Sequence, residues 1–183
     1  MRGPGSLEQF STDRLAYARP CAADLGELVA MHADPRVMAT LGGVRSPAET
    51  EEFLAQLAAH WEQHGFGLWV LREPSTRRLA GRGGLRRVAI GGADEVEVAY
   101  ALTTDFWGRG FATEVARESI RVAFSALGLP DLVCFTLVTN LASRCVMEKA
   151  GFRYERDLVH AESPHVLFRL TAPARRPAAV GPA

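Results

Sequence analysis

One segment of the 183-residue chain combines glycines, an arginine and a helix start in a way that suits phosphate binding. It reads Trp107-Gly108-Arg109-Gly110-Phe111-Ala112-Thr113-Glu114 and joins an expected strand end to an expected helix. Such a junction leaves several backbone N–H groups without intrahelical acceptors, and the helix dipole adds partial positive charge. Gly108 and Gly110 allow a tight turn and close ligand approach, and Arg109 can add a charge-assisted contact. These are the ingredients of a pyrophosphate site.

The same segment, taken alone, is also compatible with two other interpretations. An ordinary tight turn would explain a Gly-x-Gly pair without any ligand. A dinucleotide-binding Rossmann motif would need a third glycine where the chain has Thr113. The preceding strand, 95–102, alternates in the manner of a half-exposed strand rather than a central parallel one, which argues against the Rossmann interpretation.

A second segment, about 30 residues later, places polar side chains at another helix start. It reads Asn140-Leu-Ala-Ser143-Arg-Cys-Val-Met-Glu148-Lys149-Ala-Gly151-Phe152 and follows an apolar strand over 132–138. Asn140 as an N-cap and Ser143 as a first-turn residue need no function to explain them. The order and spacing of the two segments carry more information than either segment does.

Together the two segments resemble the GNAT superfamily of N-acetyltransferases, in particular the branch of ribosomal-protein N-terminal acetyltransferases (RimJ/RimL type). Members of that branch typically read W-G-x-G-[YF]-A-T-E and then N-x-x-S-x-x-x-x-E-K-x-G-F, and both patterns occur here in that order. Thr12-Asp13-Arg14-Leu15 with Arg19-Pro20, and Phe66-Gly67-Leu68-Trp69, are similar to the same branch. The resemblance covers residues 12–170.

The resemblance implies that acetyl-CoA (coenzyme A) is the cosubstrate and that no metal takes part. The pyrophosphate would lie on the amides from Gly108 to Thr113, with Trp107 in place of the polar residue that opens the broader superfamily motif. Asn140 would contact the pantetheine arm, and a backbone N–H near Leu102 or Ala101 would hold the acetyl carbonyl. The candidate cofactor-binding residues are Leu102, Trp107, Gly108, Arg109, Gly110, Phe111, Ala112, Thr113, Asn140 and Ser143.

Two residues are candidates for catalysis, because acyl transfer needs a neutral amine and a proton for the leaving thiolate. Glu97 is the candidate base, directly or through water; a solvent-facing strand glutamate that only deters edge pairing is the alternative, and Glu95 shares its face. Many superfamily members have a general-acid tyrosine seven residues after the Asn, but this chain has Met147 there. Ser143, at a helix start whose dipole favours an anion, is the candidate to support the thiolate. The five histidines are scattered and receive no catalytic role.

The candidate residues must be positioned by strands and helices, and the order of the expected elements predicts a single α/β (α+β) domain. It has a mixed, mostly antiparallel sheet of about six or seven strands with helices on both faces. Period-two alternation, apolar runs and turn residues place strands at 15–19, 67–73, 79–88, 95–102, 132–138, 152–158 and 165–170. Helical spacing and capping residues place helices at 24–33, 47–65, 111–127 and 141–150.

Composition narrows the class of protein further. The formal net charge is zero, so bulk charge predicts neither a nucleic-acid nor a membrane partner. No apolar run reaches the ~18 residues of a membrane span, and the N-terminus lacks an apolar signal core, which favours a cytoplasmic location. The three cysteines show no metal-ligand spacing.

These observations predict an N-acetyltransferase domain over 12–170, between a flexible N-terminal segment, 1–11, and a disordered tail, 171–183. The leading acceptor is the primary amine of a protein or peptide N-terminus. The alternatives are a small-molecule amine, such as an antibiotic or metabolite, and a catalytically silent coenzyme A-binding module. The sequence is also compatible with a homodimer, in which the partner is a second copy of the chain.

Overall fold

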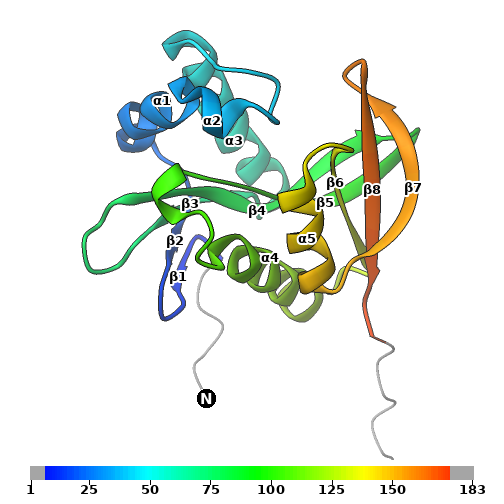
Figure 1. The fold of residues 1–183 in the computed structure, drawn as a ribbon. Coiled ribbons are helices and arrows are strands. Elements are labelled where there is room, and N and C mark those ends of the chain that lie inside the picture. The colour runs from blue at the N-terminus through cyan, green and yellow to red at the C-terminus, as the bar shows by residue number, and fades with distance from the viewer. Residues whose placement is uncertain (1–6, 174–183) are drawn as a thin grey trace, which may run out of the picture.

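The computed structural model describes residues 7–173, in which eight strands form one mixed sheet of order β1-β2-β3-β4-β5-β6-β8-β7 (Figure 1). All neighbouring strands are antiparallel except β5 and β6, which are parallel. The strands are β1 (Gln9–Ser11), β2 (Ala16–Ala18), β3 (Leu68–Arg72), β4 (Leu79–Ile90), β5 (Ala93–Leu102), β6 (Asp131–Leu137), β7 (Arg153–His160) and β8 (Ser163–Thr171).

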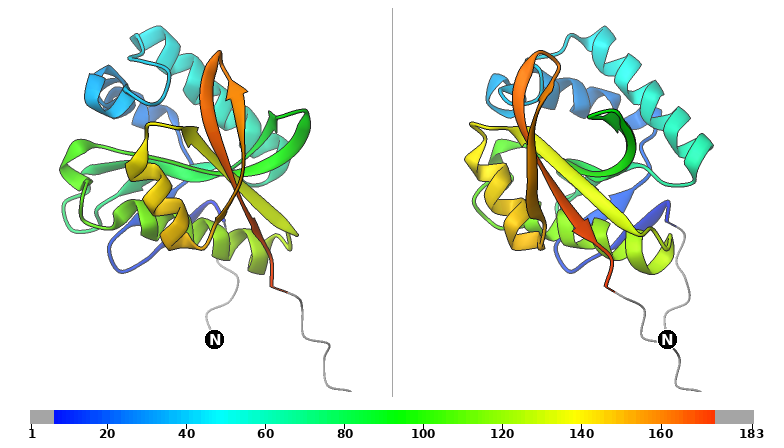
Figure 2. Two further views of the ribbon diagram at one scale, coloured as in Figure 1. Left: turned by 45° about the vertical axis from the view of Figure 1, so that its right-hand side comes forward. Right: turned by 90° about the vertical axis from the view of Figure 1, so that its right-hand side faces the viewer.

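Helices cover both faces of this sheet, as predicted. The first three lie over one face, and α4 packs on the other face against β4 and β5 with α5 beside it (Figures 1 and 2). The helices are α1 (Leu25–Ala33), α2 (Pro35–Met38), α3 (Pro47–His64), α4 (Phe111–Arg121) and α5 (Leu141–Ala150). Short 3-10 turns precede α1 and α4, and a π-helical turn, Val122–Ala126, follows α4. In residues 7–173 no helix has the length and apolar character needed to cross a membrane.

Local capping explains where the helices begin and end. The Ser46 hydroxyl accepts from the amide of Glu49, and the Glu49 carboxylate accepts from the amide of Ser46, which completes a capping box at α3. Gly65 ends α3 in the left-handed conformation. Asp34 caps a new short helix, α2, because Pro35 is acceptable at a first helical position although it cannot continue α1.

The strand count is eight rather than six or seven, because β1 was not predicted. Gln9–Ser11 lies in the segment expected to be flexible, yet it pairs with Ala16–Ala18 across a short turn. A three-residue strand is too short to show alternation, so its partner decides its conformation. Thr171 closes β8, and residues 174–183 of the expected tail lie outside the described residues.

The sheet opens between β5 and β6. Their pairing rests on one residue pair, Glu97 with Val133, and beyond it the two strands diverge (Figures 1 and 2). The main apolar core lies beneath this opening, where α4 packs on the sheet through Phe111, Val115 and Ala116. The opening therefore exposes the edges of two strands next to the N-termini of α4 and α5.

Candidate functional site

The N-terminus of α4 presents a run of free backbone amides. Gly108 and Gly110 adopt left-handed conformations, and Gly110 is the N-cap with no side-chain capping bond. Among residues 7–173, the amides from Gly108 to Thr113 form no backbone hydrogen bond of good geometry; the next amide, that of Glu114, donates to the Gly110 carbonyl at 3.1 Å. A Cβ built on Gly108 would meet no atom within 4 Å, so space lies above the turn. Amides at the positive end of a helix dipole, facing open space, suit an anionic phosphate group.

Two arginines brace this turn from its sides. Arg14 donates to Glu114 Oε2 at 2.7 Å and to the Arg109 carbonyl at 3.1 Å, while Thr12 donates to the other Glu114 oxygen at 2.6 Å. The Arg109 guanidinium lies over the rings of Phe106 and Phe111, 5.7 and 5.0 Å from their centroids. In this conformation Arg109 packs against aromatic rings beside the amides rather than projecting over them.

Trp107 links the turn to the end of β5. Its indole N–H donates to the Leu102 carbonyl at 2.8 Å, and about half of its side chain is exposed. The Thr103 amide donates to the Ala80 carbonyl at 2.9 Å, on the β4 side. Because alternate residues of an antiparallel strand bond to the same neighbour, Ala101 also faces β4, whereas Leu102 faces the β6 side. The β5–β6 pairing has already ended there, so Leu102, not Ala101, offers its N–H to the opening.

Asn140 and Ser143 meet at the start of α5, on the other side of the opening. Asn140 caps the helix by accepting from the Ser143 amide at 3.1 Å, and it donates to Thr40 at 3.1 Å and to Thr136 at 3.0 Å. The Ser143 hydroxyl is therefore not needed as a cap. It lies 3.0 Å from the Tyr100 hydroxyl, which also donates to the Ser143 carbonyl at 3.2 Å. Burial raises the pKa of Tyr100, so this phenol stays protonated.

Glu97 is buried at the point where β5 and β6 touch, with 4% of its surface exposed. The interpretation of a solvent-facing glutamate is therefore wrong, because Glu97 is buried on a central strand between β4 and β6. Its Oε2 lies 2.5 Å from Arg86 Nε, opposite it on β4. Burial raises the pKa of Glu97, and the charge of Arg86 partly offsets that rise. A carboxylate with a raised pKa is a stronger base near neutral pH.

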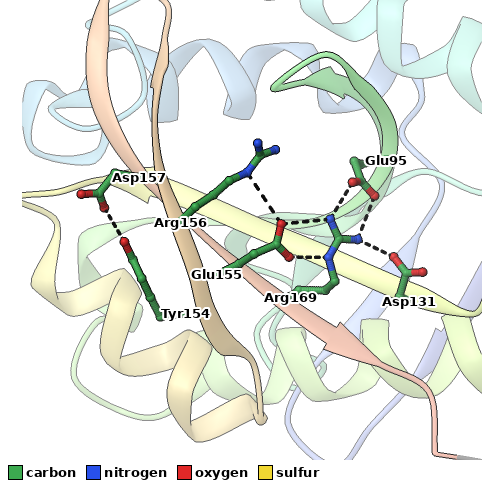
Figure 3. A network of polar contacts seen from close by, with 7 residues as sticks. All are labelled: Glu95, Asp131, Tyr154, Glu155, Arg156, Asp157 and Arg169. Carbon is green, nitrogen blue, oxygen red and sulfur yellow. Dashed lines mark hydrogen bonds and ion pairs between the residues drawn. The ribbon is translucent and has the colours of Figure 1, made fainter.

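Glu95 shares the strand but has a different environment. Arg169, on β8, donates to both Glu95 oxygens at 3.1 and 2.7 Å. The same guanidinium binds Asp131 and Glu155, so it joins carboxylates from β5, β6 and β7 (Figure 3). Glu95 therefore forms part of an ion network that ties strands together, and the geometry separates it from Glu97.

Several residues near these groups were not predicted from the sequence. Tyr100 was noted only as part of a strand pattern, and Arg14 only as part of a similar N-terminal run. Arg82 was not singled out, although a lone arginine in the glycine-rich run Gly81–Gly84 was a detectable signal. Over the described residues, no group of three His, Cys, Asp or Glu side chains is arranged to hold a metal ion.

Comparison with known sequences identifies a family. The sequence model of the acetyltransferase (GNAT) domain matches residues 14–153. The uncharacterized N-acetyltransferase YoaA of Bacillus subtilis (strain 168) is 26% identical over 148 residues, which are 80% of this chain and 83% of YoaA. An FsC-acetyl coenzyme A-N(2)-transacetylase of Aspergillus fumigatus is 41% identical over 61 residues, which are 33% of this chain but only 26% of that protein.

Solved structures share the fold across nearly their whole length. An acetyltransferase from Agrobacterium tumefaciens str. C58 has a TM-score of 0.79 at 24% identity, covering 90% of this chain and 94% of that one. A ribosomal-protein-S5-alanine acetyltransferase from Vibrio fischeri has a TM-score of 0.75 at 16% identity, covering 92% and 99%. A spermidine N-acetyltransferase from Vibrio cholerae, in complex with CoA and spermine, has a TM-score of 0.70 at 17% identity, covering 87% and 96%.

Proposed function

The chain belongs to the acetyltransferase (GNAT) domain family, and on this premise we propose that it transfers the acetyl group of acetyl-CoA to a primary amine. The observation that carries the proposal is the juxtaposition of two features. The free amides from Gly108 to Thr113 lie beside the opening of the sheet, and the Leu102 N–H faces that opening. One feature suits a pyrophosphate and the other suits a carbonyl oxygen.

The residues around the opening fit acetyl-CoA, which supplies an acetyl group activated as a thioester. The amides from Gly108 to Thr113 bind its pyrophosphate, and Asn140, at the start of α5, contacts the pantetheine arm. The Leu102 N–H donates to the acetyl carbonyl, while the Trp107 indole holds the Leu102 carbonyl, which belongs to the following peptide plane, and so restrains Leu102. A donor held in place before the reaction stabilises developing negative charge at little reorganisation cost.

Proton transfer falls to Glu97 on one side and Ser143 on the other. The amine nitrogen forms a bond to the acetyl carbon as the carbon–sulfur bond breaks, and the amine proton passes to Glu97. Glu97 is five strand residues from Leu102, about 17 Å, so the proton travels through water. The Ser143 hydroxyl, paired with Tyr100, donates to the leaving thiolate and relays to it a proton taken from water.

The proposed acceptor is the N-terminal amine of a protein or peptide. The two RimJ/RimL-type motifs support this choice, and the fold shared with a ribosomal-protein acetyltransferase is consistent with it. The fold is also shared with a spermidine acetyltransferase, so a small-molecule amine is the second candidate. A silent coenzyme A-binding module is the third.

Calorimetry with coenzyme A tests the cofactor site. Gly110→Asp places a carboxylate beside the amides, and Gly110→Asn is the matched control of equal size that also tolerates the left-handed conformation. We expect coenzyme A affinity to fall more than tenfold further in Gly110→Asp than in Gly110→Asn, a difference above about 1.4 kcal/mol. Equal affinities in two folded variants would remove the pyrophosphate from this turn.

An acetyl-transfer assay over peptides, amino acids and polyamines tests the reaction itself. Mass spectrometry of the products identifies which amine is acetylated. Transfer to peptide N-termini supports the first candidate, and transfer restricted to free small amines supports the second. Tight coenzyme A binding with no transfer to any amine would leave only the silent module.

A further inference from the structure

Arg82 is a buried arginine on β4, directly opposite Ala101. Only 6% of its surface is exposed. The next residue, Gly83, faces α4, because a Cβ built there would lie 2.6 Å from Val115. Successive strand residues point to opposite faces, so Arg82 extends to the face covered by α1 and α3. It therefore lies one residue from the proposed acetyl-binding amide of Leu102, on the face away from α4.

His32 fixes the orientation of Arg82 without neutralising its charge. Arg82 Nε donates to His32 Nε2 at 3.2 Å, and His32 Nδ1 lies 3.2 Å from the Thr50 hydroxyl. Because an arginine can only donate, Nε2 must accept and the ring proton must sit on Nδ1. Burial, with Arg82 and Arg45 nearby, lowers the pKa of His32 to about 4, so the ring is neutral.

A second arginine, Arg45, lies beside the first. Both guanidinium groups lie over the Phe53 ring, each 4.6 Å from its centroid. Arg45 Nη1 is buried and, among the contacts of residues 7–173, has no hydrogen-bond partner. Burial, with Arg45 and Arg86 nearby, lowers the pKa of Arg82 to about 9, so it remains charged at neutral pH. Phe53 therefore gathers two positive charges in one place.

No carboxylate balances these two charges. Within the described part of the chain, neither Arg82 nor Arg45 forms an ion pair. The acid that acts electrostatically on Arg82 is Glu97, whose carboxylate already binds Arg86. The acid that acts on Arg45 is Glu49, whose carboxylate binds Ser46. Buried charges in proteins are normally paired, so the two guanidinium groups lack an anion.

We propose that this anion is supplied by the acceptor: Arg82 and Arg45 bind a carboxylate carried by the amine substrate. The inference rests on the proposed acetyl transfer and specifies its substrate class. A guanidinium fork matches carboxylate geometry, and the site lies beside the residue that presents the acetyl carbonyl. The coenzyme A phosphates are assigned to α4, on the opposite face. A polyamine would bring positive charge toward two uncompensated arginines, so it is a poor acceptor.

The test compares acceptors that differ only in one carboxylate. Free amino acids are paired with their carboxamides, and peptides with Asp or Glu next to the N-terminus are paired with Asn or Gln counterparts. The wild-type protein should prefer the carboxylate member of at least one pair by tenfold or more in kcat/KM. The first pair detects an α-carboxylate and the second an acidic side chain, so the two arms distinguish the source of the anion.

Variants then assign the preference to the arginines. Arg82→Met should lower kcat/KM at least tenfold for the carboxylate acceptor and less than threefold for its amide. Arg45→Met should reduce the same preference, which keeps the test available if Arg82→Met does not fold. Arg87→Met, at an exposed arginine five residues further along β4, is the matched control and should keep the wild-type preference.

A binding measurement gives a readout that does not depend on turnover. Malonate should raise the Tm of the wild type and of Arg87→Met, but not that of Arg82→Met, at constant ionic strength. Equal kcat/KM for acids and amides, a preference for polyamines, or a preference unchanged in Arg82→Met would overturn the inference. Those results would leave acetyl transfer intact, whereas absence of transfer to every amine would instead count against the proposed function.

Discussion

Two clusters of charged residues on this sheet differ in how their arginines are paired: one around Arg169, and one formed by Arg82 and Arg45. Arg169 contacts three carboxylates, Glu95, Asp131 and Glu155 (Figure 3). Arg82 and Arg45 have none in ion-pair contact over the described residues, and Glu97 is bound to Arg86. Both clusters are built on arginines, and they differ only in their carboxylate partners. Arg169 therefore stabilises the fold, whereas Arg82 and Arg45 are available to a ligand.

Position in the sheet explains the difference. Glu95 and Asp131 lie on β5 and β6 just before the single contact between those strands, so Arg169 joins them where the opening begins. Arg82 lies opposite Ala101, near the wide end of the opening. A matched ion network lies at the narrow end, while at the wide end Arg82 has no carboxylate in ion-pair contact within residues 7–173.

Exchanging the carboxyl of Glu97 or of Glu95 for an amide should give the largest contrast. Glu97→Gln removes the proposed base, so kcat should fall about 10²–10⁴-fold with coenzyme A affinity nearly unchanged. Glu95→Gln should keep kcat within about threefold, because its carboxylate binds Arg169 instead. Steady-state kinetics on both variants, with calorimetry for coenzyme A, measures this. Similar losses of kcat in both would contradict the separate roles assigned here.

The neutral His32 beside Arg82 should give the protein a pH-dependent stability. Burial lowers the pKa of His32 to about 4, against an ordinary value of 6.5. Between these values the unfolded chain binds a proton that the folded protein does not, so stability is complete above pH 6.5 and falls toward pH 4. The loss should reach about 3 kcal/mol relative to His32→Gln. Urea unfolding of both proteins across this pH range measures it, and parallel curves would contradict it.

The same substitution at each arginine should affect stability differently. Arg169→Met leaves Glu95 and Asp131 without their ion-pair partner and Glu155 with only Arg156. We expect the free energy of unfolding to fall by about 2 kcal/mol, since the network is partly exposed. Arg82→Met loses the His32 bond but also removes an unbalanced charge, so its change should stay within about 1 kcal/mol. Chemical denaturation decides between them, and a larger loss in Arg82→Met would show that its charge is already balanced.

The smallest expected effect concerns Ser143, across the opening from both clusters. Ser143→Ala removes the hydroxyl proposed to support the thiolate, so turnover should fall about tenfold, about 1.4 kcal/mol. The Tm should change little, because Asn140 already caps α5. Tyr100→Phe removes the hydroxyl that pairs with Ser143, and the two losses should not add. Full turnover with reduced stability in Ser143→Ala would remove Ser143 from the catalytic residues.

The sequence alone predicted the features that depend on neighbouring residues. The helix starts at Ser46 and Asn140, the turn at Gly108–Gly110 and the strand before it are all present. The expectation that one face of that strand is exposed is wrong, because β5 is a central strand that pairs in parallel with β6 and is buried on both faces. Each feature that is present depends on contacts within a few residues, or on a period that repeats along one element, so a linear pattern carries the information. The fold class followed from the order of these elements.

Tertiary structure decided what depends on residues far apart in the chain. Glu97 and Glu95 look equivalent in an alternating strand, yet one meets Arg86 and the other Arg169, 74 positions away. The short strand β1 exists because β2 lies beside it. Arg82 lies among side chains from α1 and α3, so its unbalanced charge emerges only on folding. The burial and the charge balance of a side chain depend on the residues packed around it in the folded protein. No local pattern in the sequence specifies which distant residues these will be.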